Sequence, residues 1–213
     1  MPRTSPYPTA AAFMPDRLTM TALRDAVQHC EGCPLYANAT QAVFGEGLRS
    51  AEVMLVGEQP GDQEDRTGAP FVGPAGKLLD RALDEAGIDR RKAYVTNAVK
   101  HFKWRARGTR RIHDKPSWTE QRACRPWLEA ELALVKPRAL VLMGATAAQS
   151  LLGKSFRVTQ NRGAALESSL AELVTATIHP SAVLRADDRE EMFAGLVADL
   201  GLVADELRRA APR

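Results

Sequence analysis

A glycine-rich acidic turn follows an apolar run in the first third of the chain and carries side chains that could do chemistry. The segment Gly57–Asp62 comes directly after Val53–Val56 and contains two glycines and a proline. Glycines let backbone N–H groups approach a ligand, and the carboxylates of Glu58 and Asp62 could act as acid, base or orienting groups. A second rigid segment presents the ring of Phe71 shortly afterwards. The two segments together favour a ligand site over an ordinary acidic surface turn.

The cysteines point to a different kind of chemistry. There are three of them, and two are spaced as Cys30-x-x-Cys33. An odd number cannot pair off, so the pattern favours a metal or cluster site in a reducing compartment over a disulfide framework. Cys124 could belong to that site or to the apolar core.

A basic segment between Lys100 and Lys115 is the third candidate region. It holds seven Lys or Arg residues and two histidines, against one acidic residue, Asp114. Such a segment could follow a phosphate backbone, and Trp104 within it could offer a face to a base. A solvated basic loop is the alternative. The density of cations favours a nucleic-acid partner.

Strands and helices alternate along the chain and would position these groups. The predicted strands are Val53–Val56, Ala93–Thr96, Ala139–Met143 and Leu173–Ile178. The predicted helices are Thr21–His29, Ala75–Ala86, Thr119–Val135, Ala145–Leu152 and Arg189–Arg208, and a hairpin is predicted over Phe156–Leu166. This order is typical of an α/β fold with a central four-stranded parallel sheet flanked by helices.

Polar side chains follow three of the predicted strands. Glu58, Asn97 and His179 each lie just past the carboxyl end of a strand. In open α/β sheets, ligands bind in the crevice outside those ends. We therefore expect the three groups to converge on one crevice.

Length and composition bound the organisation of the chain. Its 213 residues, 45% of them apolar, suffice for one domain, which we place at residues 19–208. Residues 1–18 are rich in Pro, Ala and Thr and are expected to form a disordered tail. No apolar run approaches membrane-spanning length. We expect a monomer in the reducing cytoplasm of a prokaryote.

Five motifs in sequence order resemble those of the uracil-DNA glycosylase superfamily. They are Gly57–Asp62, Pro70–Gly76, Thr96–His101, Arg110–His113 and His179–Arg185. The chain is most similar to the iron–sulfur branch and its UdgX-type subgroup, over about residues 30 to 200. The resemblance implies the three-layer α/β fold of that superfamily and the excision of uracil from DNA, with single strands preferred.

The resemblance also implies roles for residues at the strand ends. Asn97 would read the polar edge of a flipped-out uracil, and Phe71 would stack on its ring. His179 would donate a hydrogen bond near O2 as the base leaves. Gly57 and Gln59 would line the uracil site, and the implied DNA contacts are Arg110, Arg111, Pro180, Ser181 and Leu184. Without the motifs, Asn97 would be interpreted as part of an Asx turn at a strand end, and Phe71 as an aromatic residue of the core. His179 would be interpreted as a residue that makes a structural hydrogen bond.

A metal centre follows from the same resemblance. Cluster-bearing relatives use four cysteines, whereas this chain has His101 where a fourth would stand. A [4Fe–4S] cluster held by Cys30, Cys33, His101 and Cys124 is therefore implied. Cys₃His also suits structural zinc, which remains the alternative.

His113 carries the sharpest implication. UdgX-type proteins use the histidine at this place as a nucleophile that attacks C1′ and stays attached to the DNA. Glu58 would accept a hydrogen bond from its other ring nitrogen, and nearby Arg111 would lower its pKa. Gln59 is typical of this covalent subgroup, while Thr109 departs from its usual lysine.

Two alternatives remain open at the level of sequence. The first is a multi-turnover uracil-DNA glycosylase in which Asp62 or Glu58 activates a water molecule. The second is a non-enzymatic, metal-containing module that binds nucleic acid. Asn97 and His179 at strand ends disfavour the second, since phosphate binding alone does not need them.

Overall fold

A five-stranded, mostly parallel sheet forms the centre of the protein. The computed structural model describes residues 7–209. The strand order is β2-β1-β5-β7-β6, with β1 (Val53–Gly57), β2 (Ala93–Asn97), β5 (Ala139–Met143) and β7 (Leu173–Thr177) parallel. All residues of these four strands are buried, as the apolar runs predict for a sheet covered on both faces. The predicted count of four strands is wrong by one, because the two-residue strand β6 (Ala165–Leu166) pairs antiparallel with β7 at the edge.

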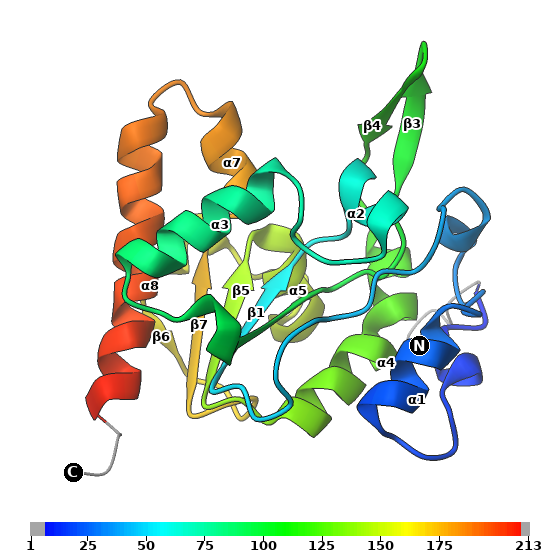
Figure 1. Ribbon diagram of the computed structural model, residues 1–213, viewed down its shortest axis with the longest axis horizontal. Coiled ribbons are helices and arrows are strands. Elements are labelled where there is room, and N and C mark those ends of the chain that lie inside the picture. Colours follow the sequence, from blue (N-terminus) through cyan, green and yellow to red (C-terminus); the bar gives the residue numbers. More distant parts are fainter. Residues whose placement is uncertain (1–6, 210–213) are drawn as a thin grey trace.

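Helices cover both faces of the sheet and complete a three-layer α/β architecture (Figure 1). One face packs against α3 (Pro74–Glu85), α7 (Pro180–Arg185) and α8 (Arg189–Arg209); the other packs against α4 (Trp118–Val135) and α5 (Ala145–Leu152). Alternate residues of β1 enter the two layers, because successive side chains of a strand point to opposite faces. No helix among residues 7–209 is long and apolar enough to cross a membrane.

Residues 7–18 do not form a free tail, because η1 (Ala10–Phe13) within them packs against α4. This N-terminal segment continues into α1 (Met20–Val27) and η2 (Pro34–Ala37). Ala10 is fully buried, and the Thr9 N–H donates to the Gly32 carbonyl at 3.1 Å. A Cβ on Gly32 would lie 2.6 Å from the Ala10 nitrogen, so this glycine permits the close approach. The predicted disorder is therefore wrong for this stretch; residues 1–6 lie outside the described residues.

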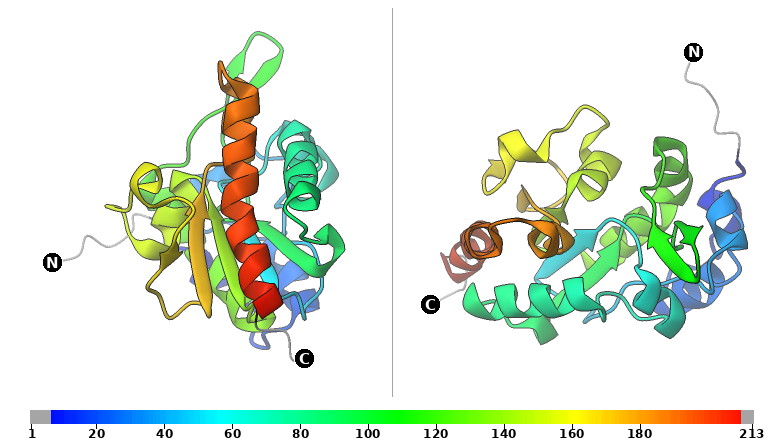
Figure 2. Two further views of the ribbon diagram at one scale, coloured as in Figure 1. Left: turned by 90° about the vertical axis from the view of Figure 1, so that its left-hand side faces the viewer. Right: turned by 90° about the horizontal axis from the view of Figure 1, so that it is seen from above.

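The basic segment forms a two-stranded ribbon and not a loop. Strand β3 (Trp104–Arg107) pairs antiparallel with β4 (Arg110–His113). Gly108 adopts a φ of 58° in the two-residue turn, a conformation that glycine favours and that suits a tight hairpin. The ribbon projects from the body of the molecule (Figures 1 and 2). It carries His113 at the end of its second strand.

Several short elements also differ from the sequence-based expectation. The predicted hairpin over Phe156–Leu166 is instead α6 (Val158–Asn161) followed by β6, whose partner is β7. The short helices α2 (Asp62–Thr67), η3 (Arg90–Lys92) and α7 were not predicted. None of these elements is longer than six residues, which is too short for hydrophobic periodicity to reveal.

Candidate active site

One large cleft opens at the carboxyl ends of the parallel strands. Its volume is about 1020 Å³, and it is lined by Asn97 of β2, Met143 of β5, residues that directly follow β1 and β7, and residues of the ribbon. Glu58, Asn97, His179 and Phe71 all face it, together with His113. The expected convergence of the strand ends is confirmed, since all three groups line the same cleft.

Gly57 lies where three side chains of the cleft meet. A Cβ placed on it would contact the Asn97 Oδ1 and would lie 2.6 Å from the Phe71 Cζ and 3.3 Å from the His179 Nε2. Only glycine therefore lets these three side chains lie so close to the end of β1. The ring of Phe71 lies 6.2 Å from the His179 ring, with an angle of 30° between their planes. These four residues form a narrow pocket with one aromatic wall.

The backbone of Phe71 is held in an unusual conformation. Its φ is 58°, in the left-handed region that non-glycine residues seldom adopt. Gly76 makes room for it, because a Cβ there would meet the Phe71 carbonyl group. The buried carboxylate of Glu64 also fixes this loop by accepting from the N–H groups of Gly61 at 3.0 Å and Gly73 at 2.7 Å. Strain that is held in place by its surroundings is typical of functional sites.

Asn97 rests on a fully buried ion pair. The Lys100 Nζ donates to the Asn97 carbonyl oxygen at 2.9 Å and pairs with Glu131, and neither charged side chain is exposed. Glu131 also accepts from the Tyr94 hydroxyl at 2.9 Å and from the Gly45 N–H at 2.9 Å. A buried pair whose remaining positions are satisfied holds its neighbours in one geometry. This network fixes the backbone that presents the Asn97 amide.

His179 is a neutral imidazole with its donor aimed into the pocket. Burial, with smaller contributions from His113 and Arg185, lowers its pKa to about 4. The Ser181 N–H donates to the His179 Nδ1 at 3.2 Å, which places the ring proton on Nε2. Within residues 7–209 this Nε2 has no hydrogen-bond partner although it is buried. A buried donor without a partner beside Gly57 is ready for a ligand acceptor.

His113 pairs with Glu58 at the edge of the cleft. Its Nε2 lies 3.3 Å from the Glu58 Oε1. Burial lowers the pKa of His113; the carboxylate of Glu58 opposes this and the cation of Arg185 reinforces it. No described residue hydrogen-bonds the other ring nitrogen, Nδ1, which is left as a potential nucleophile. The second oxygen of Glu58 accepts from the hydroxyl of Thr146, a fully buried residue that the sequence did not point to.

Arg111 is engaged by acidic residues of α2 and its neighbourhood. Its guanidinium pairs with Asp62 and, at 2.6 Å, with Asp65. The expected effect of Arg111 on the pKa of His113 is wrong, because the cation that acts on this histidine is Arg185. Asp62 is a poor base for water: burial works against ionisation, but the hydrogen bonds and charges of Arg66 and Arg111 lower its pKa overall.

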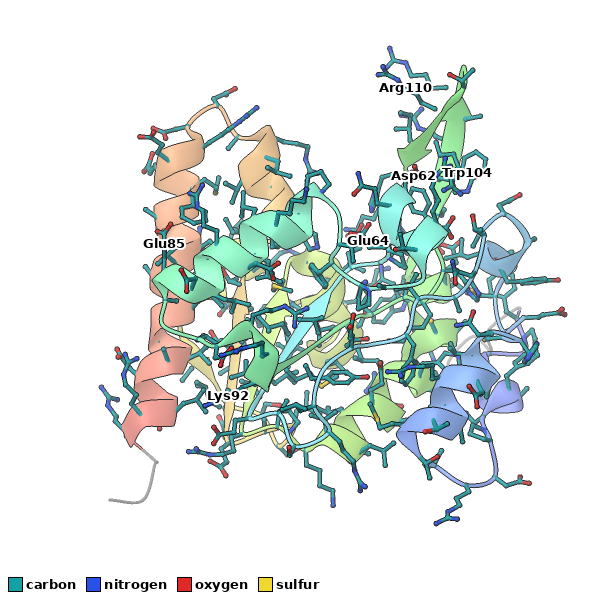
Figure 3. The ribbon with its side chains drawn as sticks, viewed as in Figure 1. Asp62, Glu64, Glu85, Lys92, Trp104 and Arg110 are labelled. Atoms are coloured by element: carbon teal, nitrogen blue, oxygen red, sulfur yellow. The ribbon has the colours of Figure 1, made fainter. Side chains whose placement is uncertain are left out.

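Gln59 and Trp104 hold the ribbon in place through hydrogen bonds to backbone groups. The Gln59 Nε2 donates to the backbone carbonyls of Lys103 at 3.0 Å and Asp114 at 3.1 Å, and its Oε1 accepts from the Lys103 N–H at 3.1 Å. All the polar atoms of this amide are thus used at the root of the ribbon, although part of the residue lines the cleft. The Trp104 indole N–H donates to the Asn38 carbonyl at 2.8 Å, and the Arg111 guanidinium lies over its ring, 5.5 Å away. Figure 3 shows Trp104 and Asp62 on either side of this root.

The remaining predicted DNA contacts are divided between the cleft and other positions. Ser181 and Leu184 line the cleft, whereas Pro180 is buried at the start of α7. Arg110 is exposed near the free end of the ribbon (Figure 3). Arg185, which sequence reasoning placed in a motif without a role, lines the cleft.

The three cysteines lie in one buried apolar cluster with Trp127. The Trp127 indole N–H lies 3.2 Å from the Cys30 Sγ, and the Lys100 backbone N–H lies 3.2 Å from the Cys124 Sγ. Burial, with a smaller contribution from Cys30, raises the pKa of Cys33 to about 11 despite an opposing backbone hydrogen bond. N–H groups directed at sulfur are suited to stabilising thiolate ligands of a metal centre.

His101 is a candidate fourth ligand. It follows Lys100 in the chain, is buried, and has a pKa lowered to about 4 by burial, so its imidazole is neutral and able to bind metal. The described residues contain no group of three or more His, Cys, Asp or Glu side chains arranged to hold a single metal ion. The donor set of three thiols and one imidazole nevertheless fits a larger centre bound by separated ligands.

The amino-acid sequence can now be compared with those of known proteins. Residues 44–201 match the family described as the uracil DNA glycosylase superfamily. The chain therefore belongs to the uracil-DNA glycosylase superfamily.

Within that family it is similar to Type-4 uracil-DNA glycosylases. It is 38% identical to the enzyme of that name from Thermotoga maritima over 172 residues, which is 80% of this chain and 86% of the relative. It is 34% identical to the one from Pyrobaculum aerophilum over 175 residues, or 79% and 86% of the two chains. A Type-5 uracil-DNA glycosylase from Thermus thermophilus is 34% identical over 125 residues, 52% of this chain and 53% of the relative.

Proposed function

We propose that this protein excises uracil from single-stranded DNA and becomes covalently linked to the abasic deoxyribose through His113. The proposal rests most on one observation: His113 and Glu58 are in contact, 3.3 Å apart, at the edge of the cleft that contains the Gly57 pocket. Membership of the uracil-DNA glycosylase superfamily supports uracil as the base. The names of the relatives give uracil-DNA glycosylase activity, and covalent capture of the DNA is an addition of this proposal.

Recognition would begin with a nucleotide flipped out of the base stack. Asn97 offers one donor and one acceptor to the O4 and N3–H edge of uracil. Phe71 supplies the stacking surface, and the absence of a side chain at Gly57 lets Asn97 and Phe71 lie close together at the end of β1. The Nε2–H of His179 would donate to O2, which gains negative charge as the base leaves.

The chemical step breaks the bond between C1′ and N1 of uracil and forms a bond between C1′ and a nitrogen of His113. The electrons of the broken bond leave with uracil as an anion, which later takes a proton from solvent. The ring nitrogen that does not face Glu58 provides the new electron pair. The resulting imidazolium is stabilised by the Glu58 carboxylate, which accepts from its N–H. The product is an N-glycosyl linkage, so each protein molecule reacts once.

We also propose that Cys30, Cys33, His101 and Cys124 hold a [4Fe–4S] cluster. When bound, the cluster would cross-link the N-terminal segment to the start of α4 and to the residues that lead into the ribbon. A brown protein with visible absorbance would support the cluster, and a colourless protein containing zinc would contradict it.

A hydrolytic uracil-DNA glycosylase is the second candidate. Glu58 could activate water in the same cleft. Its Oε1 contacts the half-exposed ring of His113, so a water molecule can reach this carboxylate oxygen. Incubation with uracil-containing single-stranded DNA, followed by a denaturing gel, separates the candidates. We expect a slow band that survives denaturation. Free abasic DNA without that band would favour hydrolysis, and neither product would favour a binding module.

Replacing Thr146 with valine is expected to slow formation of the covalent complex by about tenfold. Valine matches the shape of threonine but leaves one oxygen of Glu58 without its donor, which costs about 1–3 kcal/mol at a buried site. The carboxylate would then be free to turn away from His113. The measurement is the single-turnover rate on a denaturing gel. Thr146→Ser restores the hydroxyl and should recover most of the rate, whereas equal rates for all three proteins would contradict the role of Thr146.

Replacing Arg185 with glutamine is expected to shift the pH dependence of adduct formation upward. Neutral imidazole reacts, so the rate falls as the pH drops through the pKa of His113, which lies below its ordinary value. Removing the Arg185 cation raises that pKa, and the acid limb should move to higher pH. Single-turnover rates between about pH 4.5 and 8 measure the shift. Arg185 also lines the cleft, so the plateau rate could fall too, but an unmoved acid limb would contradict the assignment.

A further inference from the structure

The ribbon has two chemically different faces. Its register pairs Trp104 with His113, Arg105 with Ile112, Ala106 with Arg111 and Arg107 with Arg110. Side chains alternate along a strand, and directly paired residues share a face. The inner face therefore comprises Trp104, Ala106, Arg111 and His113. The outer face comprises Arg105, Arg107, Arg110 and Ile112.

The inner face anchors the ribbon to the body of the protein. Trp104 donates to Asn38, Arg111 pairs with acidic residues at α2, and His113 contacts Glu58. Each large side chain of this face thus has a partner outside the ribbon. Anchoring of the ribbon and the proposed chemistry of His113 therefore explain the residues of the inner face.

The arginines of the outer face have no such partners within the protein. Its three arginines are exposed, and none of them forms an ion pair with any residue between 7 and 209. Arg107 and Arg110 lie directly opposite each other beside the turn, and like charges in that position destabilise a strand pair. The chain therefore keeps an unfavourable arrangement that a polyanion would relieve. Ile112, on the same face, lines the cleft, so the outer face begins at the edge of the cleft.

We propose that the outer face binds the phosphates of the DNA strand on one side of the uracil. This inference rests on the proposed DNA substrate. Four residues of a strand span about 13 Å, comparable to about four nucleotide steps of a stacked strand. The ribbon projects beyond the body with Arg110 near its free end (Figures 1 and 3). His113 is the last residue of β4 and lines the cleft. The arginines therefore reach nucleotides that the cleft does not contain, and only in the direction in which the ribbon points.

Salt-dependent binding tests the inference without any chemical step. The test variant is Arg105→Gln/Arg107→Gln/Arg110→Gln, and the control, Arg17→Gln/Arg49→Gln/Arg91→Gln, removes the same charge at exposed sites off the ribbon. The probe is a uracil-free single-stranded oligonucleotide. Each neutralised phosphate contributes about 0.7 to the slope of log K against log salt concentration. We expect the slope to fall by about 2 for the ribbon variant and to stay unchanged for the control.

A second set of oligonucleotides tests whether the contact is one-sided. A 2′-fluorinated deoxyuridine, whose N-glycosidic bond resists cleavage, is placed with a long flank on both sides, on the 5′ side alone or on the 3′ side alone, so that affinity is measured without an adduct. The affinity difference between the original protein and the ribbon variant should persist with one single-flank probe and vanish with the other. Equal slopes for ribbon and control variants, or equal differences with both single-flank probes, would overturn the inference. If the original protein bound no DNA at all, the proposed function would fail with it. Binding of ordinary uracil-containing DNA without an adduct would overturn covalent capture alone.

Discussion

Replacing His113 with alanine should abolish the denaturation-resistant complex with uracil-containing DNA and leave free abasic DNA in its place. The proposed bond to C1′ needs an imidazole nitrogen, which alanine lacks. The groups that bind uracil and stabilise its departure, Asn97 and His179, stay in place, so excision continues. Water can enter the space that the half-exposed ring vacates. A denaturing gel with labelled single-stranded DNA, before and after alkaline cleavage of abasic sites, reports both products.

The matched control is His29→Ala. His29 is exposed on the N-terminal segment and takes no part in the cleft. The His29→Ala variant should form the covalent complex at the rate of the original protein. A persistent adduct in His113→Ala would rule out His113 as the attachment site.

Replacing Gly57 with alanine should reduce uracil excision by about 10²-fold or more while the protein remains folded. The added methyl group would contact the Asn97 amide and lie 2.6 Å from the Phe71 ring, so it would displace both side chains that are proposed to hold the base. Displacing reacting groups by even about 1 Å costs rates of this size. Because adduct formation follows excision, it should fall equally. Single-turnover release of uracil is the measurement.

Gly201→Ala provides the comparison for that variant. Gly201 lies in α8, and a Cβ there would meet nothing within 4 Å. Alanine favours helix by about 1 kcal/mol over glycine, so this variant should be as stable as the original or more so, with normal excision. Retained excision in Gly57→Ala would mean that uracil does not occupy the pocket.

The sheet and the meeting of the strand ends could be predicted because both follow from local patterns. Buried parallel strands are continuous apolar runs, and a polar residue just past such a run lies at the ligand-binding edge. Asn97 and His179 were placed in this way, and both line the cleft. Motif resemblance added the pairing of Glu58 with His113, which the structure brings within 3.3 Å.

The roles that depend on distant partners could not be predicted from the sequence. Gln59 bonds to backbone atoms more than forty positions away, and Arg111 pairs with Asp62 across a similar separation. No spacing rule indicates that the polar atoms of a side chain will all be hydrogen-bonded to residues so distant in the sequence. Thr146 was missed for the same reason, since only the packing of α5 brings its hydroxyl to Glu58. The cluster, the domain boundaries and the monomeric state stay predictions.

Mass spectrometry of the protein after reaction with a uracil-containing oligonucleotide tests covalent capture most directly. Covalent capture predicts a single new species, with the mass of the protein plus one oligonucleotide minus uracil. After digestion, the modified peptide should carry the deoxyribose on His113. Unmodified protein beside abasic DNA, or a sugar attached to any other residue, would contradict it.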